Sequence, residues 1–147
     1  SGLLSREQLE DMITGLLGGR AAEEITFQRV TTGASNDLER TTSIARAMVT
    51  RYGMSERLGL SVYGEDHTQV FLGRALGEPR DYSEQTARDI DEEVARIVNE
   101  CYLRAKTILL EHRDKMVRLA EVLLEQETVD RNEFLELMRD DYEIAVA

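Results

Sequence analysis

The most constraining feature of this sequence is an apolar stripe between residues 83 and 111. Its members recur three or four positions apart, the spacing that places side chains on one face of an α-helix. They are Ala87, Ile90, Val94, Ile97, Val98, Cys101, Ala105, Ile108 and Leu109. Ser83 stands just before the stripe, where its hydroxyl can cap the first turn. The pattern predicts one long helix that ends near Glu111, so the chain around it must be largely helical.

Composition limits the classes of function that are open to the chain. Its 147 residues suffice for one domain with a hydrophobic core. A net charge of −11 argues against a nucleic-acid partner, because binding phosphates needs a basic face. No apolar run approaches the roughly 20 residues of a membrane-spanning helix, so we expect a soluble chain. Cys101 is the only cysteine, which excludes an internal disulfide and suits a small buried side chain.

Two further helices are predicted before residue 60. Ser5 and Gln8 form a capping-box pattern, and the helix that follows runs to about Ile25. Its apolar stripe consists of Leu9, Met12, Ile13, Leu16 and Leu17, and the same face continues through Arg20, Glu23 and Glu24. Gly18-Gly19 would weaken this helix, so we expect the backbone of another segment to approach closely there. The second helix begins at Thr32 or Ser35 and ends before a left-handed Gly53. Its stripe is Leu38, Ile44, Ala45, Met48, Val49 and Tyr52.

The remaining segments complete a mainly α fold with at most a small β-hairpin. That hairpin would pair Leu60–Tyr63 with Val70–Leu72. A turn near His112–Lys115 leads into a further helix, which we expect to run back along the long helix as an antiparallel helix hairpin. A capping-box pattern at Asp130–Glu133 predicts a last short helix through about Met138. Residues 1–147 are expected to form a single domain, with one part at 5–80 and a C-terminal helical part at 83–139.

Several motifs of the sequence follow the order and spacing of the FtsH family of ATP-dependent zinc metalloproteases. They are Leu4–Leu9, Leu17–Ile25, Thr32–Leu38, Arg46–Thr50 with Tyr52–Ser55, Val70–Arg74 and Asp89–Val94. One such motif would be a weak signal, whereas the shared order is specific. The chain therefore resembles the C-terminal, mostly helical peptidase domain of that family, and residues 5–80 would be the part near the zinc site.

The resemblance implies properties of a larger protein. Members of the family carry an N-terminal membrane anchor and an AAA+ ATPase module that binds ATP and Mg²⁺. They form homo-hexamers at the cytoplasmic face of the inner or plasma membrane, where they degrade membrane and cytosolic polypeptides. This sequence contains no Walker A motif and no H-E-x-x-H motif. We therefore expect it to be the portion of the peptidase domain that follows the H-E-x-x-H helix.

Asp37 and Glu23 are the residues that the resemblance connects with zinc. In H-E-x-x-H proteases two histidines bind the metal, the glutamate is the general base, and a third protein ligand completes the site. By resemblance Asp37 is that third ligand, although from position alone a helix-start aspartate more often only accepts amide hydrogen bonds. Glu23 is the candidate to accept the second N–H of a zinc-bound histidine. An intrahelical pair with Arg20 is the equal alternative for Glu23.

No catalytic residue is predicted within this chain. His67 lies in a polar loop and His112 near a helix end, so ordinary surface and capping roles suit both. Val70, Phe71, Leu72 and Gly73 could offer an edge to an extended substrate, although a small stabilising hairpin is the commoner use of such a segment. Charged residues of the long helix, Glu93 among them, are expected on a solvated face, and Thr41–Ser43 on the surface of the second helix.

Two other functions fit the same sequence. Composition and periodicity suit a non-catalytic helical scaffold that binds partner helices equally well. A carboxylate cluster of Glu23, Glu24 and Asp37 could instead hold a hard cation such as Mg²⁺, with no support beyond the residues themselves. The protease assignment predicts that these residues alone bind zinc weakly and cleave nothing, because one carboxylate cannot hold a tetrahedral zinc ion.

Overall fold

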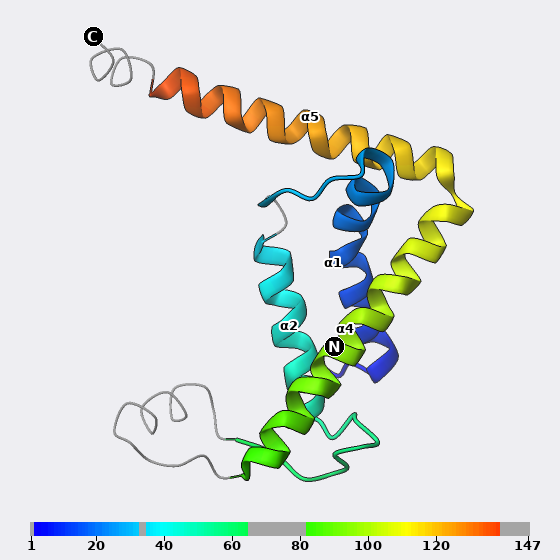
Figure 1. The fold of residues 1–147 in the computed structure, drawn as a ribbon, viewed down its shortest axis with the longest axis vertical. Helices are drawn as coiled ribbons and strands as arrows, with labels where there is room; N and C mark the ends of the chain where they lie inside the picture. Colours follow the sequence, from blue (N-terminus) through cyan, green and yellow to red (C-terminus); the bar gives the residue numbers. More distant parts are fainter. Residues whose placement is uncertain (1, 33–34, 65–81, 139–147) are drawn as a thin grey trace.

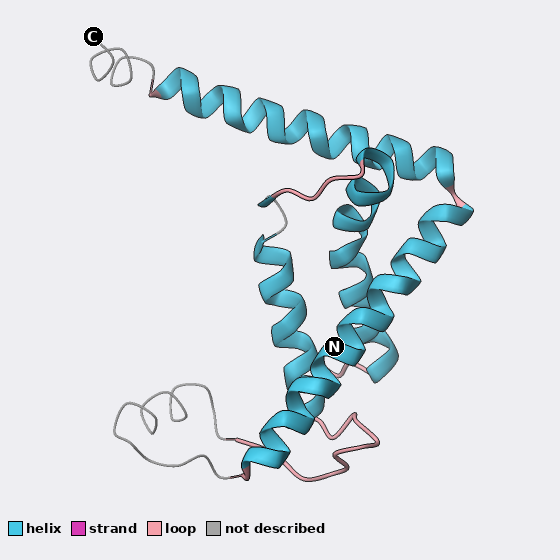
Figure 2. Ribbon diagram, in the orientation of Figure 1, coloured by secondary structure: helices cyan, strands magenta, loops and turns pink. Residues whose placement is uncertain are grey.

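The structure, a computed structural model, describes residues 2–32, 35–64 and 82–138. Within these residues the chain forms four α-helices, α1 (Arg6–Phe27), α2 (Ser35–Thr50), α4 (Glu84–Glu111) and α5 (Arg113–Leu137), as Figures 1 and 2 show. The predicted mainly helical fold is therefore confirmed. Among the described helices, none combines the length and the apolar character that crossing a membrane requires.

Helix α1 begins and ends with defined caps. The Ser5 amide donates to Gln8 Oε1 at 2.8 Å and the Gln8 amide donates to Ser5 Oγ at 3.1 Å, so the predicted capping box is confirmed. The helix continues to Phe27 and is closed by Gln28, whose φ of 54° is left-handed. The Gln28 amide donates to the Glu24 carbonyl at 2.8 Å. This cap turns the chain into the connection that leads to α2.

Helices α1, α2 and α4 lie side by side and share one hydrophobic core (Figure 1). Its buried members are Leu9, Ile13, Leu17, Ala45, Met48, Val49, Ile90, Val94, Ile97 and Cys101. All ten belong to the predicted stripes, because helical spacing brings them to the inner faces of the three helices. Met12, Tyr52 and Ile108 were predicted to join them, but their side chains are exposed. Burial raises the pKa of the Cys101 thiol, in keeping with a packing role.

Helix α5 leaves α4 at the turn around His112 and crosses the end of α1 (Figure 1). Its Met116 and Ala120 pack with Ala22 of α1. A Cβ atom at Gly19 would lie 3.1 Å from Leu123 Cδ1, so the close approach at Gly18-Gly19 is made by a side chain and not by the backbone that was predicted. The fold therefore differs from the expected antiparallel hairpin, because α5 packs on α1 instead of running back along α4.

Other predicted elements are corrected by the structure. Asp130–Glu133 does not open a new helix, because no Gly or Pro interrupts α5 between Arg113 and Leu137. Leu60–Tyr63 forms turns and irregular backbone instead of a strand, and the one β-bridge among the described residues joins Ser55 to Gly59. Gly53 has the predicted left-handed conformation, with φ of 60°. Val70–Leu72 lies outside the described residues.

Candidate functional site

Asp37 lies in the first turn of α2, directly after the connection from α1. Its side chain is 44% exposed, and its Oδ1 lies 3.9 Å from Arg40 Nη1. At that distance the two side chains form an exposed ion pair, which contributes little to the free energy of folding. Among the described residues the carboxylate is therefore held weakly, and another partner could replace Arg40 at little cost.

Glu23, near the end of α1, is a buried carboxylate with an incomplete set of partners. Only 7% of the residue is exposed, as its predicted place on the inner face implies. Its Oε2 accepts a long hydrogen bond of 3.5 Å from the Thr31 hydroxyl. Its Oε1 is 3.8 Å from Arg29 Nε, which makes an ion pair but no hydrogen bond, and among the described residues it has no hydrogen-bond donor. The connection thus supplies Arg29 in place of the expected Arg20.

Three elements meet at the hydroxyl of Thr31. Besides its contact with Glu23 on α1, Thr31 Oγ1 lies 3.3 Å from Oε1 of Glu127, which belongs to α5. Thr31 and Glu127 were not among the predicted site residues, because a contact across 96 positions follows from the crossing of α5 over α1 and not from local spacing. The proximity of Thr31 to the Thr-Gly-Ala-Ser-Asn-Asp run was the one available signal.

Glu24 is engaged elsewhere, although it adjoins Glu23 in sequence. It accepts a short hydrogen bond from the Tyr102 hydroxyl and forms an ion pair with Lys106 Nζ at 3.1 Å. The Tyr102 hydrogen bond, with the help of Lys106, lowers the pKa of Glu24. Burial, together with the Glu24 carboxylate, raises the pKa of Tyr102 to about 12. Glu24 therefore ties α1 to α4.

The hypothesis of a three-carboxylate site for Mg²⁺ is wrong for Glu23, Glu24 and Asp37. Across residues 2–32, 35–64 and 82–138, no group of three His, Cys, Asp or Glu residues is arranged to hold a metal ion. His112 is exposed and caps α4, in agreement with the predicted role. His67 and the possible substrate edge at Val70–Gly73 lie outside the described part of the chain.

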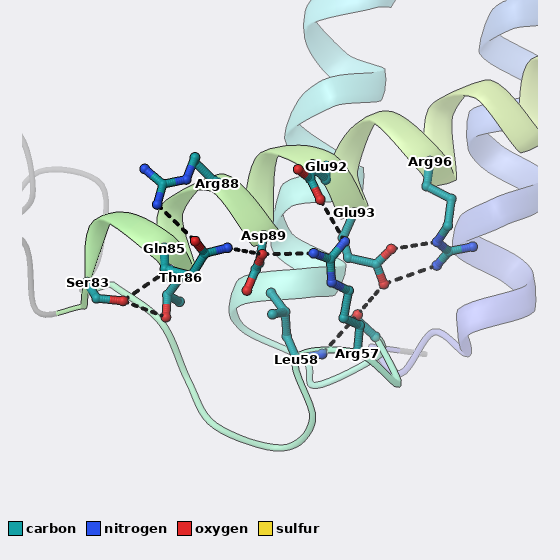
Figure 3. Close-up of polar contacts among 11 residues, drawn as sticks. Arg57, Leu58, Ser83, Gln85, Thr86, Arg88, Asp89, Glu92, Glu93 and Arg96 are labelled. Atoms are coloured by element: carbon teal, nitrogen blue, oxygen red, sulfur yellow. Dashed lines mark hydrogen bonds and ion pairs between the residues drawn. The ribbon is translucent and has the colours of Figure 1, made fainter.

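Glu93 forms a second buried polar site, in which its side chain faces Arg96 on the same helix (Figure 3). The residue is 4% exposed, which corrects the expected solvated position. It accepts hydrogen bonds from Ser55 Oγ at 2.5 Å and from Arg96 Nε at 2.6 Å. Arg96, and then Ser55, lower the pKa of the Glu93 carboxyl. Arg57 adds ion pairs to Asp89 and Glu92 at 2.8 and 2.9 Å, so this site fastens the segment after α2 to α4.

Comparisons with known proteins agree with these observations. The family model of "Peptidase family M41" matches residues 1–137. An ATP-dependent zinc metalloprotease FtsH from Thermotoga maritima is 48% identical over 144 residues, which are 98% of this chain and 24% of that protein. The protein of the same name from Bacillus subtilis is 51% identical over 135 residues, 91% of the chain and 21% of its own length. The chain thus spans about a quarter of the length of these relatives.

Proposed function

Because the chain belongs to peptidase family M41, we propose that it is part of the peptidase domain of an ATP-dependent zinc metalloprotease that hydrolyses polypeptides. The observation that carries this proposal is the buried Glu23, whose Oε1 is shielded from water yet lacks a hydrogen-bond donor among the described residues. Leaving such an oxygen unpaired costs free energy, so a donor from outside the described chain is expected.

Asp37 is the proposed zinc ligand of this chain. A carboxylate is an ordinary ligand of Zn²⁺. Among the described residues, the half-exposed Asp37 side chain is held only by the long contact with Arg40. The residues present therefore fit one corner of a zinc site. The other ligands and the general base would come from an H-E-x-x-H motif outside these 147 residues.

Glu23 is the proposed acceptor for the outer N–H of a histidine ligand. Such a carboxylate fixes the orientation and the tautomer of the imidazole ring and raises its basicity. The free Oε1 suits this role, and Arg29 limits the repulsion that a buried charge would otherwise meet. Zinc, when bound, supplies Lewis-acid polarisation of the peptide carbonyl. The residues of this chain contribute one ligand and the orientation of another.

Further properties are proposed by analogy with the relatives. The larger protein would use ATP with Mg²⁺ to deliver substrates, would assemble as a homo-hexamer, and would reach the membrane through an N-terminal anchor, with its peptidase domain on the cytoplasmic face. Val70–Gly73 would offer a strand edge to the substrate, where main-chain hydrogen bonds bind polypeptides of many sequences.

The test compares Asp37→Asn with Glu39→Gln in the full-length protein that carries this segment. Glu39 is exposed on the same helix and is the matched control. We expect Asp37→Asn to lower zinc content and to abolish casein cleavage, whereas Glu39→Gln should change neither. The 147-residue chain alone should bind zinc weakly and leave casein intact. Zinc content unaffected by Asp37→Asn would contradict the ligand assignment and favour the scaffold alternative.

A further inference from the structure

We propose that Thr31 and Glu127 are positioning residues that hold the Glu23 carboxylate so that its Oε1 stays available to a metal-bound histidine. The inference rests on the proposed function and adds two residues to it, one of them from α5. Neither residue is proposed to touch the metal or the substrate. Both would act through the orientation of Glu23.

The two oxygens of Glu23 are in different environments, and Thr31 is the cause. The Thr31 hydroxyl is directed at Oε2, at 3.5 Å, while Oε1 is buried and, among the described residues, has only the 3.8 Å ion pair with Arg29. A carboxylate that could rotate freely would exchange the two oxygens. Because Thr31 contacts Oε2, the carboxylate is held in the orientation that leaves Oε1 for the N–H of the proposed histidine ligand.

Glu127 determines where Thr31 lies. Its Oε1 is 3.3 Å from the Thr31 hydroxyl, and the residue comes from α5, which crosses the end of α1 above the connection (Figure 1). Thr31 has no regular secondary structure of its own and follows the left-handed turn at Gln28. Because α5 is itself packed on α1, the contact with Glu127 restricts the position of Thr31 relative to Glu23.

The charges around Thr31 make the arrangement energetically costly. Two carboxylates, Glu23 and Glu127, converge on one hydroxyl, which has a single proton to donate. Like charges that approach each other are unfavourable, and Arg29 offsets this only in part, through a contact of 3.8 Å to a side chain that is itself 48% exposed. Such a costly arrangement is expected where orientation of a functional group is required.

The test measures the zinc affinity of the full-length protein by competition with a chelator, for Thr31→Val, Thr31→Ser, Glu127→Ala and Glu127→Gln. Loss of an outer-shell partner lowers metal affinity about 10- to 100-fold, and a partner one step further out should act near the lower figure, about 10-fold, in Thr31→Val and Glu127→Ala. The conservative variants should retain the affinity of the wild type, because Thr31→Ser keeps the hydroxyl donor and Glu127→Gln keeps an oxygen acceptor. Glu125→Ala, on an exposed position of α5, is the matched control.

A Glu23→Gln variant separates the two levels of the hypothesis. If Glu23→Gln leaves zinc affinity unchanged, the proposed role of Glu23 is wrong, and this inference is overturned with it. If Glu23→Gln lowers the affinity while Thr31→Val and Glu127→Ala behave like Glu125→Ala, only the positioning role is overturned. Equal losses in Thr31→Ser and Thr31→Val would also overturn it, because the hydroxyl would then not be the acting group. Thermal unfolding of each variant confirms that zinc is measured on folded protein.

Discussion

Glu23 and Glu93 are both buried carboxylates, but their surroundings differ. Glu93 receives hydrogen bonds of 2.5 Å from Ser55 and 2.6 Å from Arg96. Glu23 has contacts of 3.5 and 3.8 Å with Thr31 and Arg29, and its Oε1 has no hydrogen-bond donor among the described residues. Among the described residues the first site is complete, whereas the second leaves one buried oxygen without a hydrogen-bond donor. Burial alone therefore does not distinguish the two glutamates, and the difference lies in their partners.

The largest expected effect tests the completeness of the Glu93 site. Removing one partner of a buried pair costs about 3–5 kcal/mol, and because Arg96 is half exposed we expect Glu93→Ala to lower the free energy of unfolding by about 2 kcal/mol. Urea denaturation of the 147-residue chain measures this. Glu92→Ala, one position away, removes only the exposed ion pair with Arg57 and should change stability by less than about 0.5 kcal/mol. Equal effects of the two variants would show that Glu93 is not the anchor.

The same site predicts an acid-dependent loss of stability. Arg96 and Ser55 lower the pKa of Glu93 in the folded state, so its stabilising effect is present above the unfolded value of about 4.3 and is lost as pH falls through the folded pKa. The difference in unfolding free energy between wild type and Glu93→Gln should be constant above about pH 5 and should shrink below about pH 4. A difference that persists unchanged at pH 3 would contradict an ionised, paired Glu93.

Helices and their inner faces could be predicted from the sequence because both are local properties. The spacing of Leu9, Ile13 and Leu17 identifies a buried face whatever covers it, and the same reasoning placed Glu23 inside. The capping box at Ser5 was also readable, since its hydrogen bonds join residues three apart. The similar pattern at Asp130 failed, because a cap forms only where a helix begins and nothing interrupts α5 there.

The contacts that could not be predicted from the sequence depend on how separate segments of the chain pack against each other. Glu93 lies beside the apolar stripe of its helix, but only the chain after α2, which brings Ser55 against it, decides that the residue is buried. Glu127 reaches Thr31 because α5 crosses α1, a geometry that a helical pattern does not encode. Of the candidate metal site, the positions of Asp37 and Glu23 were predictable, and the partners of Glu23 were not.

Thr41 can be compared with Glu23 and Glu93, because it is also a buried polar residue. Its hydroxyl lacks a hydrogen-bond partner among the described residues, and no function is evident for it. The residue was expected on the surface of α2, yet it is 0% exposed and its hydroxyl has no partner among the described residues. Thr14, Thr50, Thr107 and Thr128 instead donate to the carbonyl four residues earlier. Thr41→Val should therefore stabilise the chain by about 1 kcal/mol in urea denaturation. Thr42→Val, at an exposed position, is the control, and a destabilised Thr41→Val would reveal a hidden partner.

The crossing of α5 over α1, which brings Glu127 to the Glu23 site, can be tested at two adjacent glycines. A Cβ at Gly18 meets open space, so Gly18→Ala should raise the free energy of unfolding by about 0.5–1 kcal/mol through helix propensity. At Gly19 the added Cβ would lie 3.1 Å from Leu123 Cδ1, and that flexible side chain must shift. Gly19→Ala should gain less or nothing. Equal gains in both variants would show that α5 does not pack closely on α1.

The smallest expected effect is also the sharpest test of the contrast between the two glutamates. Glu23→Gln removes a charge that, among the described residues, is paired only through a 3.8 Å contact with a half-exposed Arg29, so its loss costs little stability. It also changes a buried group whose Oε1 has no hydrogen-bond donor among the described residues, and the two effects oppose each other. We expect the free energy of unfolding to change by less than about 0.5 kcal/mol, well below the loss in Glu93→Ala. A loss comparable to that of Glu93→Ala would mean that Glu23, too, is a structural anchor, and its unpaired oxygen would no longer point to a missing partner.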